Sequence, residues 1–278
     1  MDYKIVVDSC CEIPADLKDD GRFEVVPLSL MVGDCEIVDD ESFDQADFLR
    51  RVAESPECPH SACPSPAAYM EAYRTEADRV YVVTLSSKLS GSYNAAVLGA
   101  EMYKETYGEK DIYVVDSETA SGGESQIMLK LMEYEAAGMT FAQITEKISV
   151  FRNKIHTYFV LDNLDAMIKN GRIRGIKAMV ATTLNVKPIL AGLKGSIIQK
   201  GQAIGMKKTL AKMVETIVAE VGELENKRII ITHCNALKRA EKVRDMLREK
   251  YKTCEYIIMD MRGVSSLYAS DGGIIVTM

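Results

Sequence analysis

The sequence predicts an α/β fold built from two α/β domains, the first with a mainly parallel sheet and the second with a smaller mixed sheet. Short apolar runs that end in polar, turn-forming residues indicate strands buried on both faces. Helical patterns between and after these runs indicate the right-handed crossovers that join parallel strands. The length of 278 residues exceeds that of the usual single-core domain and therefore favours two domains.

The first predicted domain spans residues 1–154 and contains the clearest alternation of strands and helices. Gly122 and Gly123 precede one helical pattern, and Gly138 ends it. Residues 25–38 alternate around Gly33 and predict a hairpin or a pair of extended edge segments. The predicted strands are 4–7, 80–85 and 112–115, and the predicted helices are 90–107, 122–138 and 140–154.

The second predicted domain spans residues 155–278 and combines helices with a hairpin. Two helices are expected on either side of the turn at residues 170–172, and a hairpin is expected around the glycine-containing turn 193–196. The predicted helices are 159–169, 176–184, 207–225 and 236–251, and the predicted strands are 185–190, 228–232 and 256–259.

Composition places the chain among ordinary globular proteins and excludes several partners. Hydrophobic residues make up 47% and charged residues 27%. The 34 basic and 41 acidic side chains give a net charge of -7, which argues against nucleic acid. The start has no signal-peptide pattern, and no apolar stretch approaches the roughly 18 residues of a membrane span, so we expect a cytoplasmic protein. Seven cysteines without a dense framework indicate reduced thiols.

Hydroxyl side chains gather where three predicted strands end. Ser9 follows the first strand, residues 86–92 contain four serines after the second, and Ser117 follows the third. Ligands of parallel sheets bind at the carboxyl ends of strands, and a serine-rich loop entering a helix offers donors to an oxyanion. We therefore interpret residues 86–92 as an anion site; the alternative is that these serines only cap helices.

Catalytic interpretations find less support in the sequence. A serine nucleophile needs a nearby base, and none of His60, His156 and His233 lies in a recognisable motif with a serine. A phosphotransferase would use Asp8 or Asp116 as an aspartyl nucleophile, but the carboxylate pair that would hold magnesium is missing. Phosphate-binding glycine motifs are also missing.

A metal site is not expected. Cys58, His60 and Cys63 supply three possible ligands within six residues, but four-coordinate zinc requires a fourth. Cys10 and Cys11 are adjacent and lack the redox spacing of a C-x-x-C motif. We therefore predict neither a metal nor a cofactor.

Five short motifs occur in order along the chain. They are Val7-Asp8-Ser9 with Pro14, Ser61-Ala62-Cys63-Pro64-Ser65-Pro66, Ser86-Ser87-Lys88-Leu89-Ser90-Gly91-Ser92-Tyr93, Val115-Asp116-Ser117, and Asn170-Gly171-Arg172-Ile173 followed by Leu184-Asn185-Val186-Lys187-Pro188-Ile189-Leu190. No single motif is specific, but with all five in this order the chain resembles, from end to end, the DegV family of bacterial fatty-acid-binding proteins.

The resemblance implies a non-enzymatic carrier that holds a long-chain fatty acid between its two domains. Similar proteins present the fatty acid to a separate ATP-dependent fatty-acid kinase, which makes acyl-phosphate for phospholipid synthesis. Carried over by position, the carboxylate contacts are Ser61, Ser87, Ser90, the amide of Gly91 and Arg172. The alternative role of Arg172 is to hold the interdomain turn. Further candidates are Ser86, Ser9, Ser117 and Ser270.

The chain departs from the family pattern near its C-terminus. Residues 270–274 read Ser-Asp-Gly-Gly-Ile where the family usually has His-Thr-Gly-Pro-Gly, and a common basic residue falls on Ile204. The carboxylate would then be held more by neutral hydroxyls, and Asp271 near an anion would bind its proton more tightly. The 15 methionines suit either an adaptable acyl tunnel or core filling.

Two alternatives to the carrier remain open from the sequence. One is a small-molecule hydrolase or phosphotransferase that uses Asp8, Asp116 and the serines. The other is a regulatory protein whose lipid site is altered, which would explain the missing histidine.

Overall fold

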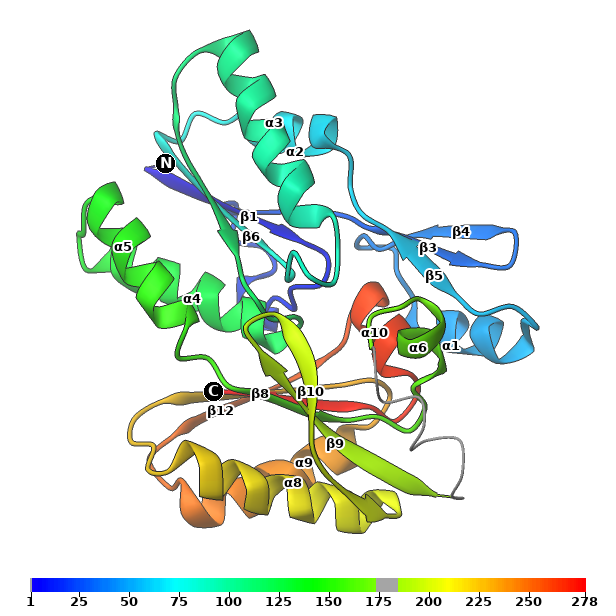
Figure 1. The fold of residues 1–278 in the computed structure, drawn as a ribbon. Helices are drawn as coiled ribbons and strands as arrows, with labels where there is room; N and C mark the ends of the chain where they lie inside the picture. The colour runs from blue at the N-terminus through cyan, green and yellow to red at the C-terminus, as the bar shows by residue number, and fades with distance from the viewer. Residues whose placement is uncertain (1, 174–184) are drawn as a thin grey trace.

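The computed structural model describes residues 2–173 and 185–278 and contains two large sheets and one small one. Sheet A has four parallel strands in the order β2-β1-β6-β7 (Figure 1). The strands are β1 (Tyr3–Asp8), β2 (Phe23–Val26), β6 (Arg79–Thr84) and β7 (Asp111–Asp116). The mainly parallel first sheet predicted from the apolar runs is therefore present.

Helices cover both faces of sheet A, which explains why its strands lack apolar alternation. Ile5 and Val7 of β1 pack into the cluster under α4 and α5, whereas Val6 packs into the cluster under α2 and α3. All three side chains are fully buried. The helices are α2 (Pro66–Ala72), α3 (Ser92–Tyr107), α4 (Gly122–Ala136) and α5 (Phe141–Arg152).

A small antiparallel sheet, sheet B, lies beside sheet A and includes the predicted hairpin. Its order is β4-β3-β5, and β3 and β4 are joined at Gly33 and Asp34. The bounds are β3 (Ser29–Val32), β4 (Cys35–Val38) and β5 (His60–Ala62), with α1 (Gln45–Glu54) between β4 and β5. Residues 23–26 belong instead to the edge of sheet A.

Sheet C is mixed and has six strands in the order β10-β9-β8-β13-β11-β12. Within sheet C, only β11 and β12 pair in parallel, and the other described pairs of this sheet are antiparallel. The strands are β8 (Thr157–Val160), β9 (Val186–Leu193), β10 (Ser196–Ile204), β11 (Arg228–His233), β12 (Glu255–Asp260) and β13 (Ile274–Thr277). The turn at residues 194–195 joins β9 to β10, as predicted.

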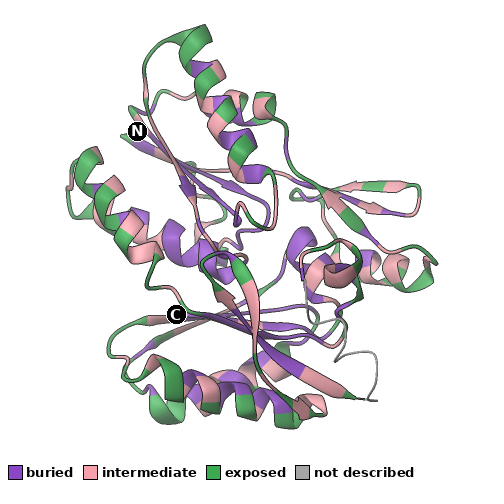
Figure 2. Cartoon of the chain, in the orientation of Figure 1, coloured by how far each residue is buried: buried purple, intermediate pink, exposed green. Residues whose placement is uncertain are grey.

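The two faces of sheet C have different neighbours. Helices α8 (Met206–Val221) and α9 (Leu237–Lys250) cover one face (Figure 1). The start of α4 and helix α10 (Gly263–Ala269) lie on the other side, where buried residues concentrate (Figure 2). The approach of α4 is close, because a Cβ on Gly122 would lie 2.9 Å from a methyl carbon of Ile230.

The helix predicted over residues 159–169 is wrong at its start. Residues 157–160 form β8, and the helix α6 spans only Asp165–Lys169. All four β8 residues are buried, and β8 pairs with both β9 and β13. Tertiary pairing of β-forming residues thus overrides the local helical pattern. The predicted helix 176–184 lies outside the described residues. The short helix η1 (Ala15–Leu17) and the elements α1, α2, β5, α10 and β13 were not predicted.

None of the helices in the two described stretches combines the length and apolarity that crossing a bilayer requires.

Gly99 in the middle of α3 offers a test of the packing between α2 and α3. An added Cβ would lie 2.7 Å from the Pro66 carbonyl oxygen and 2.9 Å from the Tyr69 Cβ. Helix propensity alone favours Gly99→Ala by about 1 kcal/mol, but overpacking against backbone costs about 1 to 3 kcal/mol. We expect Gly99→Ala to lower the free energy of unfolding in urea titrations. The exposed control Glu105→Ala should leave it nearly unchanged; a stabilised Gly99→Ala would contradict the packing argument.

Candidate functional site

A cavity of about 830 Å³, including its open part, lies where the carboxyl ends of the sheet A strands meet sheet C and α10. The loops after β1, β6 and β7 contribute Cys10, then Leu85, Leu89 and Ser90, and then residues 118–121. This is the edge of a parallel sheet at which ligands bind. The cavity therefore lies at the strand ends where hydroxyl side chains gather in the sequence.

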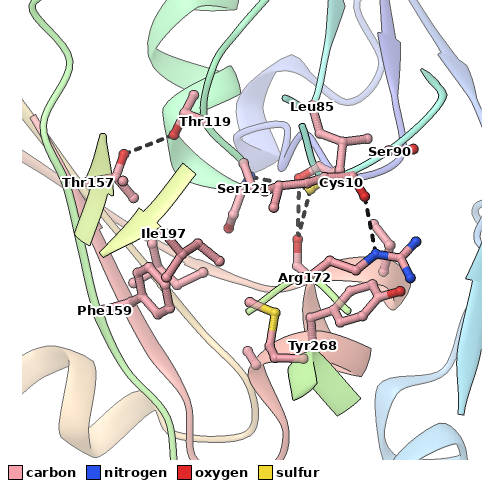
Figure 3. A pocket seen from close by; sticks show the side chains of 18 of the residues that line it. Cys10, Leu85, Ser90, Thr119, Ser121, Thr157, Phe159, Arg172, Ile197 and Tyr268 are labelled. Atoms are coloured by element: carbon pink, nitrogen blue, oxygen red, sulfur yellow. Dashed lines mark hydrogen bonds between the residues drawn. The ribbon is translucent and has the colours of Figure 1, made fainter. Parts of the chain in front are cut away.

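Most of the cavity wall is apolar. Phe159 and Ile197 lie at one side of the cavity, and Arg172 and Tyr268 lie at the other (Figure 3). An apolar enclosure with an arginine at one end suits a ligand with a long hydrocarbon tail and one polar head. The apolar lining side chains are Leu28, Leu85, Leu89, Ala120, Phe159, Leu161, Met167, Ile197, Val264, Ala269 and Ile275. Within the described lining, Met167 is the single methionine, which favours core filling for most of the others.

The polar end brings together three of the expected residues. Ser61 on β5, Ser90 in the loop before α3, and Arg172 after α6 all line the cavity. The Ser61 Oγ lies 3.0 Å from the Oη of Tyr268, which also lines it. The Ser90 Oγ accepts a hydrogen bond of 3.2 Å from the amide of Ser92, so its own hydrogen remains available to a ligand.

Arg172 provides a positive charge at this end. Its Nε donates to the Leu89 carbonyl at 3.2 Å, and its Nη1 donates to the Asn170 carbonyl at 2.8 Å. Its guanidinium carbon lies 5.3 Å from the centre of the Tyr268 ring. No carboxylate in the described part of the chain forms an ion pair with Arg172. The cavity thus contains an arginine whose partners are neutral carbonyls, an arrangement that favours an anion.

Other members of the serine loop support the loop rather than face the cavity. Ser87 donates from both its amide and its hydroxyl to Asp116, and Ser86 donates its hydroxyl to the Gly195 carbonyl at 3.1 Å. Gly91 sits against Cys63, whose Sγ would lie 3.1 Å from an added Cβ. The described residues that line the cavity include neither Ser87, Ser86 nor Gly91, and the hydroxyls of Ser86 and Ser87 are already used by neighbours within the fold.

The remaining candidates also have partners elsewhere. The Ser9 Oγ accepts from the Leu28 amide at 3.0 Å, and the Ser117 hydroxyl donates to the Thr119 carbonyl at 3.2 Å. Ser270 ends α10 with φ of 59°. Asp271 accepts from the Asn235 side chain at 3.0 Å on the surface. None of these four belongs to the described lining, so the expected influence of Asp271 on a bound anion is not supported.

The two strand-end aspartates hold the loops together. Asp8 is fully buried and accepts from the Cys10 amide, the Leu85 amide and the Ser92 hydroxyl at 3.1, 2.9 and 2.7 Å. Burial raises the pKa of Asp8, while these hydrogen bonds oppose the rise. Asp116 accepts from Ser87 and from the Glu118 amide. Neither carboxylate lines the cavity in the described structure, which disfavours an aspartyl nucleophile.

Sequence reasoning missed several lining residues. Tyr268 and Ser265 lie on α10, a helix that was not predicted. The hydroxyls of Thr119 and Thr157 form a hydrogen bond across the boundary between sheets A and C, with their oxygens 2.9 Å apart. Ser121 bonds to Thr232 in the same region at 2.7 Å. The serine and threonine content of residues 117–121 was the one signal that could have indicated this part.

The group of possible metal ligands in the described structure is not the set Cys58, His60 and Cys63 considered in the sequence. Ligand atoms of Asp8, Cys10 and Glu124 lie within 4.8 Å of one another, and all three residues are buried. Burial, and then the charge of Asp8, raises the pKa of Glu124 well above its usual value. Both carboxyl oxygens of Glu124 are buried without a hydrogen-bond partner in the described structure, and protonation of Glu124 reduces the negative charge of the group. Cys63, from the sequence grouping, is exposed.

Glu12 beside this group makes stability depend on pH. Burial raises the pKa of Glu12 from 4.5 to about 7, and one of its oxygens has no partner in the described structure. Between these values the folded chain holds a proton that the unfolded chain has released. Raising the pH from 4.5 to 7 should therefore lower the free energy of unfolding, by on the order of 3 kcal/mol from this residue.

Glu12→Gln should flatten that slope, because the amide carries no titrating proton. Denaturant unfolding at pH 4.5 to 8 measures the effect, with the exposed Glu249→Gln as control. A slope that is equal in wild type and Glu12→Gln would show that Glu12 is charged in the folded protein.

Comparisons with known proteins agree on one family. A family model described as an uncharacterised protein of the DegV family matches residues 2–277. A DegV domain-containing protein of Streptococcus gordonii is 31% identical over 280 residues, which cover 99% of this chain and 98% of that protein.

Solved structures extend the match. A DegV family protein of Ruminococcus gnavus, described with vaccenic acid, has 47% identity and a TM-score of 0.95 over 99% of both chains. The fatty acid kinase B3 protein of Streptococcus pneumoniae, described as loaded with linoleic acid, has 29% identity and a TM-score of 0.91 over 100% of this chain and 99% of its own. The chain therefore belongs to the DegV family.

Proposed function

We propose that this protein is a carrier that binds a long-chain fatty acid in the cavity, with the carboxylate at Ser61, Ser90 and Arg172. The observation that carries the proposal is the apolar cavity with an arginine and free hydroxyl donors at one end. The Ruminococcus gnavus and Streptococcus pneumoniae relatives, described with vaccenic and linoleic acid, support it. The acid is a ligand, and the proposed role requires no cofactor.

The tail contributes most of the binding free energy in this proposal. Burying about 15 methylenes at about 0.8 kcal/mol each gives on the order of 12 kcal/mol before the costs of ordering and association. A hydrogen bond to the charged head group contributes about 1.5 to 3 kcal/mol. The head group therefore sets the orientation of the ligand and the class of ligand that is accepted.

The two proposed domains, 1–154 and 155–278, place the ligand at their boundary. The first contributes Leu85, Leu89, Ser90 and residues 118–121 to the cavity lining. The second contributes Thr157, Phe159, Leu161, Gly192 and residues 195–197. The hydroxyl pair Thr119 and Thr157 joins the two parts beside the cavity. A ligand enclosed in this way is shielded from water without any membrane segment.

We further propose that the protein presents the carboxylate to a fatty-acid kinase, which forms acyl-phosphate for phospholipid synthesis in the cytoplasm. Support comes from the relative named fatty acid kinase B3. Asp8 and Asp116 are used by loop amides, so the hydrolase or phosphotransferase alternative lacks a nucleophile in the cavity. The alternative of a lost lipid site is disfavoured because the cavity has an apolar lining.

Denaturing solvent extraction followed by mass spectrometry tests the carrier directly. We expect one long-chain acid per protein molecule, or stoichiometric uptake of added vaccenic acid by the native protein. No acyl chain after extraction, together with no uptake of vaccenic acid, would rule out the carrier.

A matched pair of substitutions on β10 tests where the tail lies. Ile197 lines the cavity, whereas Ile204 near the other end of the same strand is 65% exposed. Ile197→Trp should fill the space and reduce affinity for vaccenic acid by at least about tenfold. Ile204→Trp should bind like the wild type. Equal affinity in both variants, with circular dichroism confirming their fold, would place the tail elsewhere.

Coupling to a kinase has its own test. With a bacterial fatty-acid kinase and ATP, the wild-type protein loaded with vaccenic acid should yield acyl-phosphate, which hydroxylamine traps as the hydroxamate. Ile197→Trp should yield little. Stoichiometric lipid binding without any hydroxamate would leave a carrier that does not serve that kinase.

A further inference from the structure

Two hydroxyl groups from distant segments meet at the polar end of the cavity. Ser61 lies on β5 and Tyr268 on α10, and their oxygens are 3.0 Å apart. Each hydroxyl has a single hydrogen. When one donates to the other, the pair has one hydrogen left to donate. Both side chains line the cavity, so this remaining donor is available to a ligand there.

The positively charged guanidinium of Arg172 packs against the ring of Tyr268. The guanidinium carbon lies 5.3 Å from the ring centre, within the range of a cation–π contact. Arg172 also bonds to the Leu89 carbonyl, which fixes it against the serine loop (Figure 3). A cation, a phenol and a serine hydroxyl thus converge on one end of an apolar cavity.

Resting on the proposed function, we propose that Tyr268 recognises the carboxylate as one half of a coupled donor pair with Ser61. One hydroxyl of the pair donates to the carboxylate, and the other donates to the first. The second hydrogen bond polarises the first, so the two residues act together. Because a hydrogen bond to an anion is stronger than one to a neutral oxygen, the pair selects an acid over the alcohol with the same tail.

Tyr268→Phe isolates this role, because it removes the hydroxyl and keeps the ring that packs beneath Arg172. Binding of vaccenic acid and of octadec-11-en-1-ol, its primary alcohol, is measured for wild type, Tyr268→Phe, Ser61→Ala and the double variant. Affinity of Tyr268→Phe for the acid should fall about tenfold or more, and affinity for the alcohol should change by less than about twofold. Tyr107→Phe, an exposed tyrosine on α3, is the matched control and should bind both as the wild type does.

The double variant tests the coupling. Its loss of acid affinity should be smaller than the product of the two single losses, because either substitution already breaks the pair. Multiplicative losses would overturn the coupling, and an unchanged preference for the acid in Tyr268→Phe would overturn the recognition role. Equal weakening of acid and alcohol would show that Tyr268 only packs. A wild type that binds neither ligand would instead refute the carrier itself.

Discussion

The cavity depends on the buried carboxylate of Asp8 at the end of β1. It accepts hydrogen bonds from the amides of Cys10 and Leu85 and from the hydroxyl of Ser92. These bonds tie the end of β1 to the end of β6 and to the start of α3, so two cavity-lining loops are fixed by one side chain. Asp116 at the end of β7 plays a similar part, because it accepts hydrogen bonds from the amide and hydroxyl of Ser87. Removing a partner from such a buried group leaves it unsatisfied, which is costly.

Contact between the two sheets is the second constraint. Gly122 lets α4 approach sheet C so closely that a Cβ would lie 2.9 Å from Ile230. Hydroxyls complete the contact, since Ser121 bonds to both Glu12 and Thr232. Burial at this contact raises the pKa of Glu12 and so favours its neutral form. The cavity lies beside these contacts, so the packing that joins the sheets also shapes the binding space.

The sequence was sufficient for features that depend on local pattern and insufficient for those that depend on tertiary neighbours. The runs at 5–7 and 80–85 are buried on both faces, and the edge run at 112–115 is partly buried; such apolar runs leave a clear signal in the sequence. The strand β8 was mistaken for helix because its pairing with β9 and β13 is not visible locally. The serine loop was located, but the direction of its hydroxyls was not, because Ser87 turns to Asp116. Tyr268 carries no motif and lies on an unpredicted helix.

In the proposed carrier, charge and apolar area divide the task of recognition. In a chain with net charge -7, an anionic head group needs a local cation, and Arg172 supplies one whose described partners are neutral carbonyls. Contacts at Phe159 and Ile197 are non-directional and depend on area, so they respond to tail length and shape. Donors at the opposite end are directional and respond to the head group. In the proposed carrier, selection among acyl chains and selection of the acid thus reside in different residues.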